Sequence, residues 1–225
     1  MREEDSNKDS IEDLENAINR LQKSSGSKNK LAQAHNQLGL SYFKDGRFEK
    51  ALDQYNKAID IDGENDIYYN NRSLALSHSK QLDAALADLK KALEIKSDDP
   101  RTYYNRGSIY KSKKEFELAH EDFDRAIELA ERIPAYKNSS SFYHAKGLAF
   151  SYDHQYEAAK ECFRIAMDRD PSNMQSIFHY GLMQHRLKEL SGALASFTTV
   201  IENKPKKDGL SKEKMEDRIV GRILT

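Results

Sequence analysis

Small and large apolar residues recur along this chain with a period of 34 residues, interrupted by one step of 40. The strictest series consists of alanines: Ala51, Ala85, Ala119, Ala159 and Ala193. Four residues after each alanine stands a large apolar side chain: Tyr55, Leu89, Phe123, Phe163 and Phe197. A second small or branched residue follows three positions later: Ala58, Ala92, Ala126, Ala166 and Val200. Positions i, i+4 and i+7 share one face of an α-helix, so the pattern predicts an amphipathic helix in every period.

Another helix is predicted before each of these. A small residue lies 12 positions ahead of each alanine: Gly39, Ser73, Gly107, Gly147 and Gly181. The polar strings KDGR, HSKQ, KSKKE, YDHQ and RLKE separate the two helices of each period. Each period is thus a helical hairpin in which small residues let the two axes approach closely. Because one hairpin cannot bury its apolar face alone, the hairpins must stack, and the predicted fold class is all-α.

Five hairpins can be placed, at residues 32–65, 66–99, 100–133, 140–173 and 174–207. Six additional residues, 134–139, fall between the third and the fourth. We expect a lengthened surface connection there, which an extension of the preceding helix can accompany.

Partial repeats are expected at both ends of the chain. Ala17 lies 34 residues before Ala51, so residues 10–23 of the acidic segment 1–31 resemble the second helix of a degenerate repeat. Ser10 and the acidic residues after it predict the start of that helix, and the string SSGSKNK predicts a loop at its end. Residues 208–225 are expected to form a capping helix or to begin a further repeat, because their apolar residues can share one face: Leu210, Met215, Ile219 and Ile223.

The units resemble tetratricopeptide repeats (TPRs), which are helix–turn–helix units of 34 residues. Two hairpins carry the resemblance most fully: Leu38-Gly39-Tyr42-Ala51-Tyr55-Ala58 and Tyr103-Gly107-Tyr110-Ala119-Phe123-Ala126. Pro171 and Pro205 stand where a repeat ends, whereas Ser73 and Gln184 depart from the usual Gly and Tyr. The resemblance covers residues 32–207 and implies a right-handed superhelical solenoid of stacked antiparallel helix pairs. It also implies a non-enzymatic adaptor or scaffold that binds other proteins.

Composition and charge narrow the classes of partner. The formal net charge of −1 offers no excess of positive charge for nucleic acid or for an anionic membrane. The lysine-rich stretch Lys204–Lys214 contains Asp208 and Glu213 and no aromatic residue, so we expect a solvated surface there. No apolar run approaches the ~20 residues that span a bilayer, and the polar start differs from a signal peptide. The only cysteine, Cys162, is expected to be a packed or half-exposed thiol, and together these features predict a cytoplasmic protein.

Sequence signatures of catalysis and of metal binding are absent. None of the strings GxGxxG, GxxxxGKS, GxxxxGKT, GxSxG and HExxH occurs. The seven histidines are scattered, and His179 and His185 lie six positions apart on different helix faces, so we expect no zinc site. No catalytic residue and no cofactor is therefore expected.

In the TPR family the first helices of stacked hairpins line a concave groove, and the resemblance places a partner there. The residues expected to contact it are Asn36, Asn70, Asn71, Arg101, Tyr104, Asn105, Lys111, His144, Tyr152, Phe178, His179 and His185. Asn71 and Asn105 occupy the same repeat position and resemble asparagines that hold the backbone of an extended peptide, since an amide offers both a donor and an acceptor. The alternative is that YNNRS and YYNRG are generic repeat strings.

Aromatic and imidazole side chains of this set gather toward the C-terminal half of the chain. Such side chains make good anchors because they bury much area at little cost in rotamer entropy. The alternative is that several of them, Phe178 in particular, pack against the next hairpin.

The chaperone carboxylate clamp of the TPR family is not expected to be intact. Of its five positions only Asn71 matches, because Asn36 and Leu40 replace Lys and Asn, and Arg101 and Asn105 replace Lys and Arg. Arg101 and Lys111 could still attract an acidic segment. The leading hypothesis is therefore a module that binds an extended or helical segment of another protein in its groove. The alternative is a structural subunit of a large permanent assembly that uses convex faces or array ends, which would also permit self-association.

Overall fold

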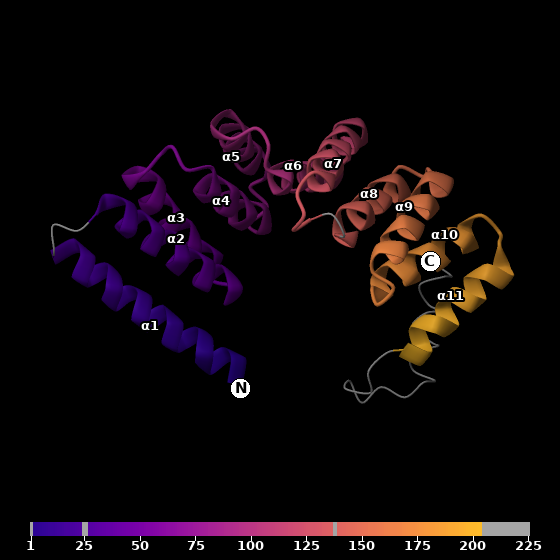
Figure 1. Cartoon of the computed structure of the whole chain (residues 1–225), viewed down its shortest axis with the longest axis horizontal. Coiled ribbons are helices and arrows are strands. Elements are labelled where there is room, and N and C mark those ends of the chain that lie inside the picture. The colour runs from indigo at the N-terminus through magenta and orange to yellow at the C-terminus, as the bar shows by residue number, and fades with distance from the viewer. Residues whose placement is uncertain (1, 24–26, 137–138, 204–225) are drawn as a thin grey trace. The chain divides into compact units, whose positions relative to one another are not determined.

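The computed structural model describes residues 2–23, 27–136 and 139–203, with side chains from Ser10 onward. These residues form helices and no strand, which confirms the predicted fold class, an all-α array of stacked helix pairs. The helices are α1 (Arg2–Lys23), α2 (Lys28–Lys44), α3 (Phe48–Ile61), α4 (Asp66–His78), α5 (Leu82–Ile95), α6 (Pro100–Lys113), α7 (Phe116–Glu131), α8 (Ser140–Tyr152), α9 (Tyr156–Arg169), α10 (Met174–Arg186) and α11 (Leu190–Asn203) (Figure 1). None of them is long and apolar enough to cross a membrane.

The chain forms two compact units, Met1–Ile109 and Tyr110–Thr225, and α6 runs from the first into the second. In the first unit α2 packs against α3 and α4 against α5, while α1 covers α2 and α3 contacts α4. In the second unit α8 packs against α9 and α10 against α11, with α7 on α8 and α9 on α10. Each unit is therefore built from hairpins that bury the faces of their neighbours.

A large aromatic side chain packs on a glycine at the centre of each of three hairpins. Tyr55 of α3 is fully buried against Gly39 of α2, where an added Cβ would come within 2.6 Å of its Cε1 atom. A Cβ added at Gly147 would lie 2.8 Å from the Cε1 atom of Phe163, and a Cβ added at Gly181 would lie 2.8 Å from the Cε1 atom of Phe197. The glycines are needed because a methyl group at these positions would overlap the ring.

The turns inside the hairpins share one backbone conformation. Five residues at the same repeat position have a positive φ of 59° to 72°: Gly46, Lys80, Lys114, His154 and Lys188. After α2, the Gly46 N–H donates to the Phe43 carbonyl and the Arg47 N–H donates to the Tyr42 carbonyl, at 3.0 and 2.9 Å. This is a Schellman motif, which satisfies the last carbonyls of the first helix, and the other four turns repeat it.

The predicted start of the first helix at Ser10 is wrong. Helix α1 begins at Arg2, so Ser10 lies inside it, and α2 begins at Lys28, within the expected loop. The first nine residues contain neither Gly nor Pro and carry three acidic residues before Asn7, which favour the N-terminal end of a helix. Ile18 of α1 is buried against the core around Leu38 and Tyr42.

The described residues around the insertion form a longer preceding helix and a turn. Helix α7 has 16 residues, against 14 in α3, so the preceding helix is longer. The chain then turns through Arg132–Tyr136, where the Tyr136 N–H donates to the Ile133 carbonyl at 2.9 Å. The predicted capping helix, Pro205 and the lysine-rich stretch lie outside the described residues.

Candidate functional site

The expected groove residues all lie on first helices of hairpins. In the first unit these helices are α2, α4 and the start of α6, which carry Asn36, Asn70, Asn71, Arg101, Tyr104 and Asn105. In the second unit they are the end of α6, α8 and α10, which carry Lys111, His144, Tyr152, Phe178, His179 and His185.

Asparagines of the first unit pair between successive hairpins. The Asn71 Nδ2 atom donates to Asn36 Oδ1 at 2.8 Å, and the Asn105 Nδ2 atom donates to Asn70 Oδ1 at 2.8 Å. Asn70 in turn donates to the hydroxyl of Thr102. Asn36 and Asn70 are buried, whereas Asn71 and Asn105 are half-buried. The pairs therefore satisfy buried amides and also fix the orientation of two amides that reach the surface.

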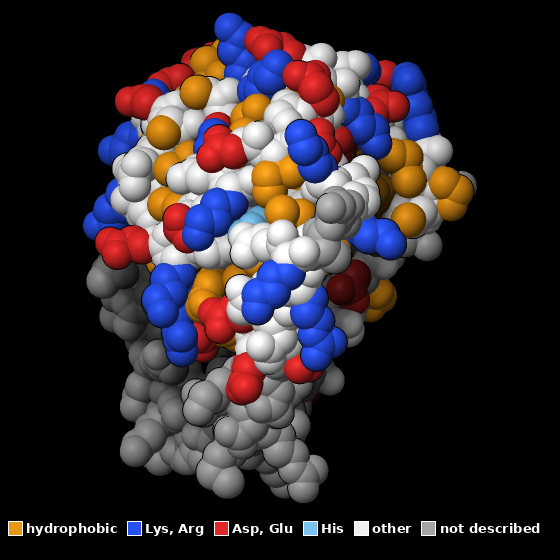
Figure 2. Space-filling view, turned by 90° about the vertical axis from the view of Figure 1, so that its left-hand side faces the viewer, with side chains coloured by type: hydrophobic (Ala, Val, Ile, Leu, Met, Phe, Trp, Pro, Cys, Tyr) orange, Lys and Arg blue, Asp and Glu red, His pale blue; other side chains and the backbone are white. Residues whose placement is uncertain are grey.

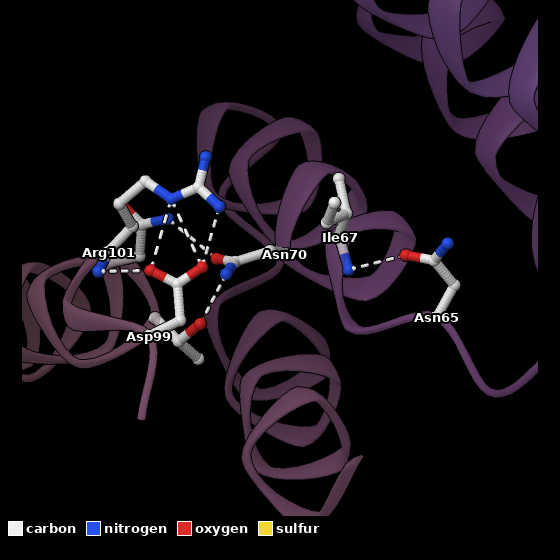
Figure 3. Close-up of polar contacts among 7 residues, drawn as sticks. Asn65, Ile67, Asn70, Asp99 and Arg101 are labelled. Carbon is white, nitrogen blue, oxygen red and sulfur yellow. Dashed lines mark hydrogen bonds and ion pairs between the residues drawn. The ribbon is translucent and has the colours of Figure 1, made fainter. Parts of the chain in front are cut away.

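Asp99 organises the beginning of α6. It precedes Pro100, the first residue of the helix, and its carboxylate accepts the Arg101 backbone N–H at 2.9 Å (Figure 3). This arrangement is a helix N-cap followed by proline. The Arg101 guanidinium also lies against the carboxylate, with Nη2 at 2.7 Å from Oδ2. Burial opposes the charge of Asp99, but the hydrogen bonds from Arg101 offset it and lower the pKa of Asp99.

The Arg101 guanidinium is therefore already paired with the Asp99 carboxylate, and an acidic partner would meet this ion pair instead of a free positive charge. Tyr104, the remaining expected residue of this unit, is half-buried, and burial raises the pKa of its hydroxyl. Asp99 and Thr102 were not among the expected residues. A signal for Asp99 was present, because Asp before Pro at the start of a helix is a common cap.

In the second unit two imidazoles lie on the buried ring of Phe163. The centroids of His144 and His179 each stand 5.4 Å from the Phe163 centroid, and the His179 ring is stacked on it. The two imidazoles contact each other edge to face, also at 5.4 Å. His144 and His179 occupy the same pair of repeat positions as Asn36 and Asn71. The inter-hairpin contact is therefore an imidazole pair here and an amide pair in the first unit.

His144 is further held by Ser176 of α10, whose Oγ atom lies 2.9 Å from its Nδ1 atom. These residues occupy the positions of Asn70 and Thr102, and Ser176 was likewise not expected. Burial lowers the pKa of His144, and the positive charge of Lys111 lowers it further. The neutral imidazole is therefore favoured at the site.

The other aromatic side chains of this unit differ in their contacts. Phe178 is half-buried and packs on Phe197 of α11 at 5.7 Å between centroids, a contact within its own hairpin. Tyr152 is 63% exposed, and the Lys111 Nζ atom stands 6.0 Å from the centre of its ring. His185 is half-buried on α10. Tyr152 is thus the aromatic side chain of this set that offers most surface to a partner.

The described part of the chain also contains a cysteine, possible metal-ligating side chains and charged side chains at its surface. The Cys162 thiol is buried, and burial raises its pKa to about 11, which makes it unreactive at neutral pH. No group of three or more His, Cys, Asp or Glu side chains among the described residues is placed to hold a metal ion. On the face shown in Figure 2, basic and acidic side chains are interspersed. That face therefore carries no field of a single sign.

Comparison with known proteins identifies the repeats. Models of the tetratricopeptide repeat match residues 32–65, 100–132 and 144–208, and a TPR repeat model matches residues 78–114. No curated protein matches the chain.

Solved structures share the fold at low sequence identity. MamA from Desulfovibrio magneticus RS-1 is 22% identical with a TM-score of 0.68, over 81% of this chain and 98% of that one. YrrB, described as a TPR protein with an unusual peptide-binding site, is 17% identical with a TM-score of 0.60, over 84% and 92%. The APC/C hetero-tetramer Cut9–Hcn1 is 15% identical with a TM-score of 0.74, over 96% of this chain and 40% of that one. Because the matching repeat models together cover more than half of the 225 residues, the chain belongs to the tetratricopeptide repeat family.

Proposed function

We propose that this protein binds a segment of another protein along the first helices of its hairpins. The observation that carries the proposal is the pair of oriented amides, Asn71 and Asn105. Each donates one N–H to a buried asparagine of the preceding hairpin, and neither Oδ1 atom has a partner among the described residues. A peptide backbone has N–H groups that such a fixed acceptor can bind without reading side chains.

The similarity to YrrB supports this proposal only at the level of the fold, since in that protein the same architecture holds a peptide-binding site. The proposed segment is not captured through a chaperone carboxylate clamp, because Asn36 and Leu40 stand where the clamp needs Lys and Asn. We place the protein in the cytoplasm on the sequence features given above.

The test begins with random 12-residue peptides selected for binding to the full chain. The affinity of a selected peptide is then measured for the double variant Asn71→Ala, Asn105→Ala. Two lost hydrogen bonds of about 0.5–1.5 kcal/mol each predict a loss of affinity on the order of tenfold.

The double variant will also melt at a lower temperature, because Asn36 and Asn70 each lose the donor to their Oδ1 atom. The matched control is Asn56→Ala with Asn65→Ala, which removes the acceptor of the Arg72 Nη1 atom and the cap of α4. Both pairs lose side-chain hydrogen bonds of asparagine, but the control residues do not belong to the proposed groove. If both double variants bind the peptide equally well, the amides do not hold it.

A specific observation also favours the alternative, a structural subunit that uses an array end. Leu190 and Leu194 lie one turn apart on α11 and are 63% and 68% exposed. The residues at these positions in α9 are partly covered, since Tyr156 packs against the cluster that contains Met183 of α10 and the Lys160 Nζ atom pairs with Glu189 at 2.5 Å. An exposed face of this kind fits a further helix from a partner. Cut9–Hcn1 shows that the fold occurs within a hetero-tetramer.

Light scattering tests this alternative on the chain alone. Self-association through α11 predicts a mass above that of one chain, and Leu190→Lys with Leu194→Lys restores the monomer mass. The matched control is Leu118→Lys, a partly exposed leucine of α7. A monomer mass for the unmodified chain removes self-association through this face.

A further inference from the structure

Lys111 is a partly buried cation without a carboxylate partner among the described residues. Other partly buried basic side chains of the second unit form ion pairs: Lys146 with Asp124, Lys160 with Glu189 and Arg169 with Glu131. The Arg72 guanidinium in the first unit likewise holds Asp88 through two hydrogen bonds of 2.6 and 2.7 Å. Lys111 therefore differs from these partly buried basic side chains, each of which forms an ion pair with a carboxylate.

The surroundings of Lys111 disfavour its charge. Burial lowers the pKa of Lys111, and no acidic side chain opposes this effect. The imidazole of His144 is close enough for the two positive charges to repel each other, which contributes to the lowered pKa of His144. A partly dehydrated ammonium without a counter-ion raises the free energy of the protein, and a carboxylate placed beside it would lower that free energy.

The side chains beside Lys111 define the rest of the subsite. The exposed ring of Tyr152 lies 6.0 Å from Nζ and offers an apolar surface next to the charge. His144 has one ring nitrogen committed to Ser176, and its Nε2 atom has no partner among the described residues. Helices α8 and α10 carry the candidate residues onward to His179 and Phe178.

We propose that Lys111, with Tyr152 and His144 beside it, is a subsite for an Asp or Glu side chain within the bound partner segment. This proposal rests on the proposed function and specifies one element of the partner, an acidic residue followed or preceded by an apolar one that packs on Tyr152. Lys111 supplies the charge, Tyr152 supplies the apolar contact, and His144 provides a second polar atom.

The test compares peptide selections on three forms of the full chain: unmodified, Lys111→Met and Lys160→Met. The peptides are displayed with their C-termini fused to the carrier, so no free terminal carboxylate is present. Met has nearly the length of Lys and no charge, and Lys160 is the matched control because it is partly buried but already paired with Glu189. We expect a recurrent Asp or Glu in peptides selected on the unmodified chain and on Lys160→Met, and its loss on Lys111→Met.

A synthetic, amidated form of one selected peptide gives the quantitative result. Replacing its acidic residue by the amide should weaken binding to the unmodified chain on the order of tenfold and leave binding to Lys111→Met unchanged. An equal loss with both proteins, or selected peptides without a recurrent acidic residue, overturns the subsite and leaves the proposed function standing. Binding that requires a free C-terminus overturns the assignment to a side chain. Failure of all three forms to select any peptide overturns the proposed function itself.

Discussion

Single side chains link successive hairpins and also form the candidate groove. The same repeat positions hold an amide pair at Asn36 and Asn71 and an imidazole pair at His144 and His179. In the amide pair, buried Asn36 accepts one N–H of half-buried Asn71, so part of the hydrogen-bonding capacity of Asn71 stays at the surface. Stability and the proposed binding therefore involve some of the same residues, and binding experiments need controls that are matched for stability.

His120 predicts how stability depends on pH. Its ring stacks on Phe150 at 3.9 Å between centroids, and neither ring nitrogen has a hydrogen-bond partner within the part of the chain that the structure describes. Burial lowers the pKa of His120, which outweighs the attraction of Asp153, whose Oδ2 atom lies 3.6 Å from Nε2. Below the unfolded-state pKa of about 6.5, the unfolded chain binds the proton more strongly than the folded chain does. The free energy of unfolding should therefore fall as the pH decreases from 7.5 to 5.5.

Urea denaturation at both pH values measures this effect. His120→Phe keeps the ring contact and removes the titrating group, so it should reduce the difference between the two pH values. His154→Gln is the control, since His154 is exposed. An unchanged pH dependence in His120→Phe would show that His120 is not responsible.

The apolar residues of the hairpins could be predicted from the sequence, whereas the polar contacts between hairpins could not. Ala51, Tyr55 and Gly39 recur at a fixed period, and periodicity is sufficient to assign them to one buried face. Asn36 and Asn71 are also separated by a recurrent spacing, but spacing does not show that two side chains on different helices meet. That contact depends on the distance and rotation between stacked hairpins, which only coordinates provide.

At the level of elements, the turns inside the hairpins fix how the two helices of each hairpin are joined. All five place one residue in the left-handed region, although only Gly46 is a glycine. The polar turn strings predicted where the chain turns but not this conformation, because Lys and His seldom adopt it. The start of α1 was predicted wrongly because Ser10 is of a residue type that caps helices, while the residues before it also favour helix.

Lys80→Gly should stabilise the first unit. Lys80 is exposed and has a φ of 60°, a conformation that costs a non-glycine residue about 1–2 kcal/mol. Glycine removes this cost but loses more backbone entropy on folding, so we expect a net gain of about 0.5–1 kcal/mol.

The reverse substitution serves as the counterpart. Gly46 has a φ of 72°, and an added Cβ would meet nothing within 4 Å, so Gly46→Ala tests the backbone term without a steric clash. It should lower the free energy of unfolding by about 1 kcal/mol. Thermal and urea denaturation measure both changes. A loss of stability in Lys80→Gly would contradict the assigned conformation of the turn.

At the level of the whole molecule, we propose two kinds of surface for partner binding. One lies on first helices of the hairpins, with the oriented amides in the first unit and the subsite at Lys111 in the second. The other is the exposed face of α11 around Leu190 and Leu194. The repeat pattern predicted the first surface through its resemblance to the TPR family, and the exposed leucines became evident only from the coordinates.

The side-chain amide resonances of asparagine provide the most direct test of groove binding. In a nitrogen–proton correlation spectrum of the full chain, a selected peptide is added and the shifts of all asparagine NH₂ groups are followed. We expect the largest shifts for Asn71 and Asn105, with Asn56 and Asn203 unaffected. Shifts confined to backbone amides of α11, with Asn71 and Asn105 unchanged, would contradict it.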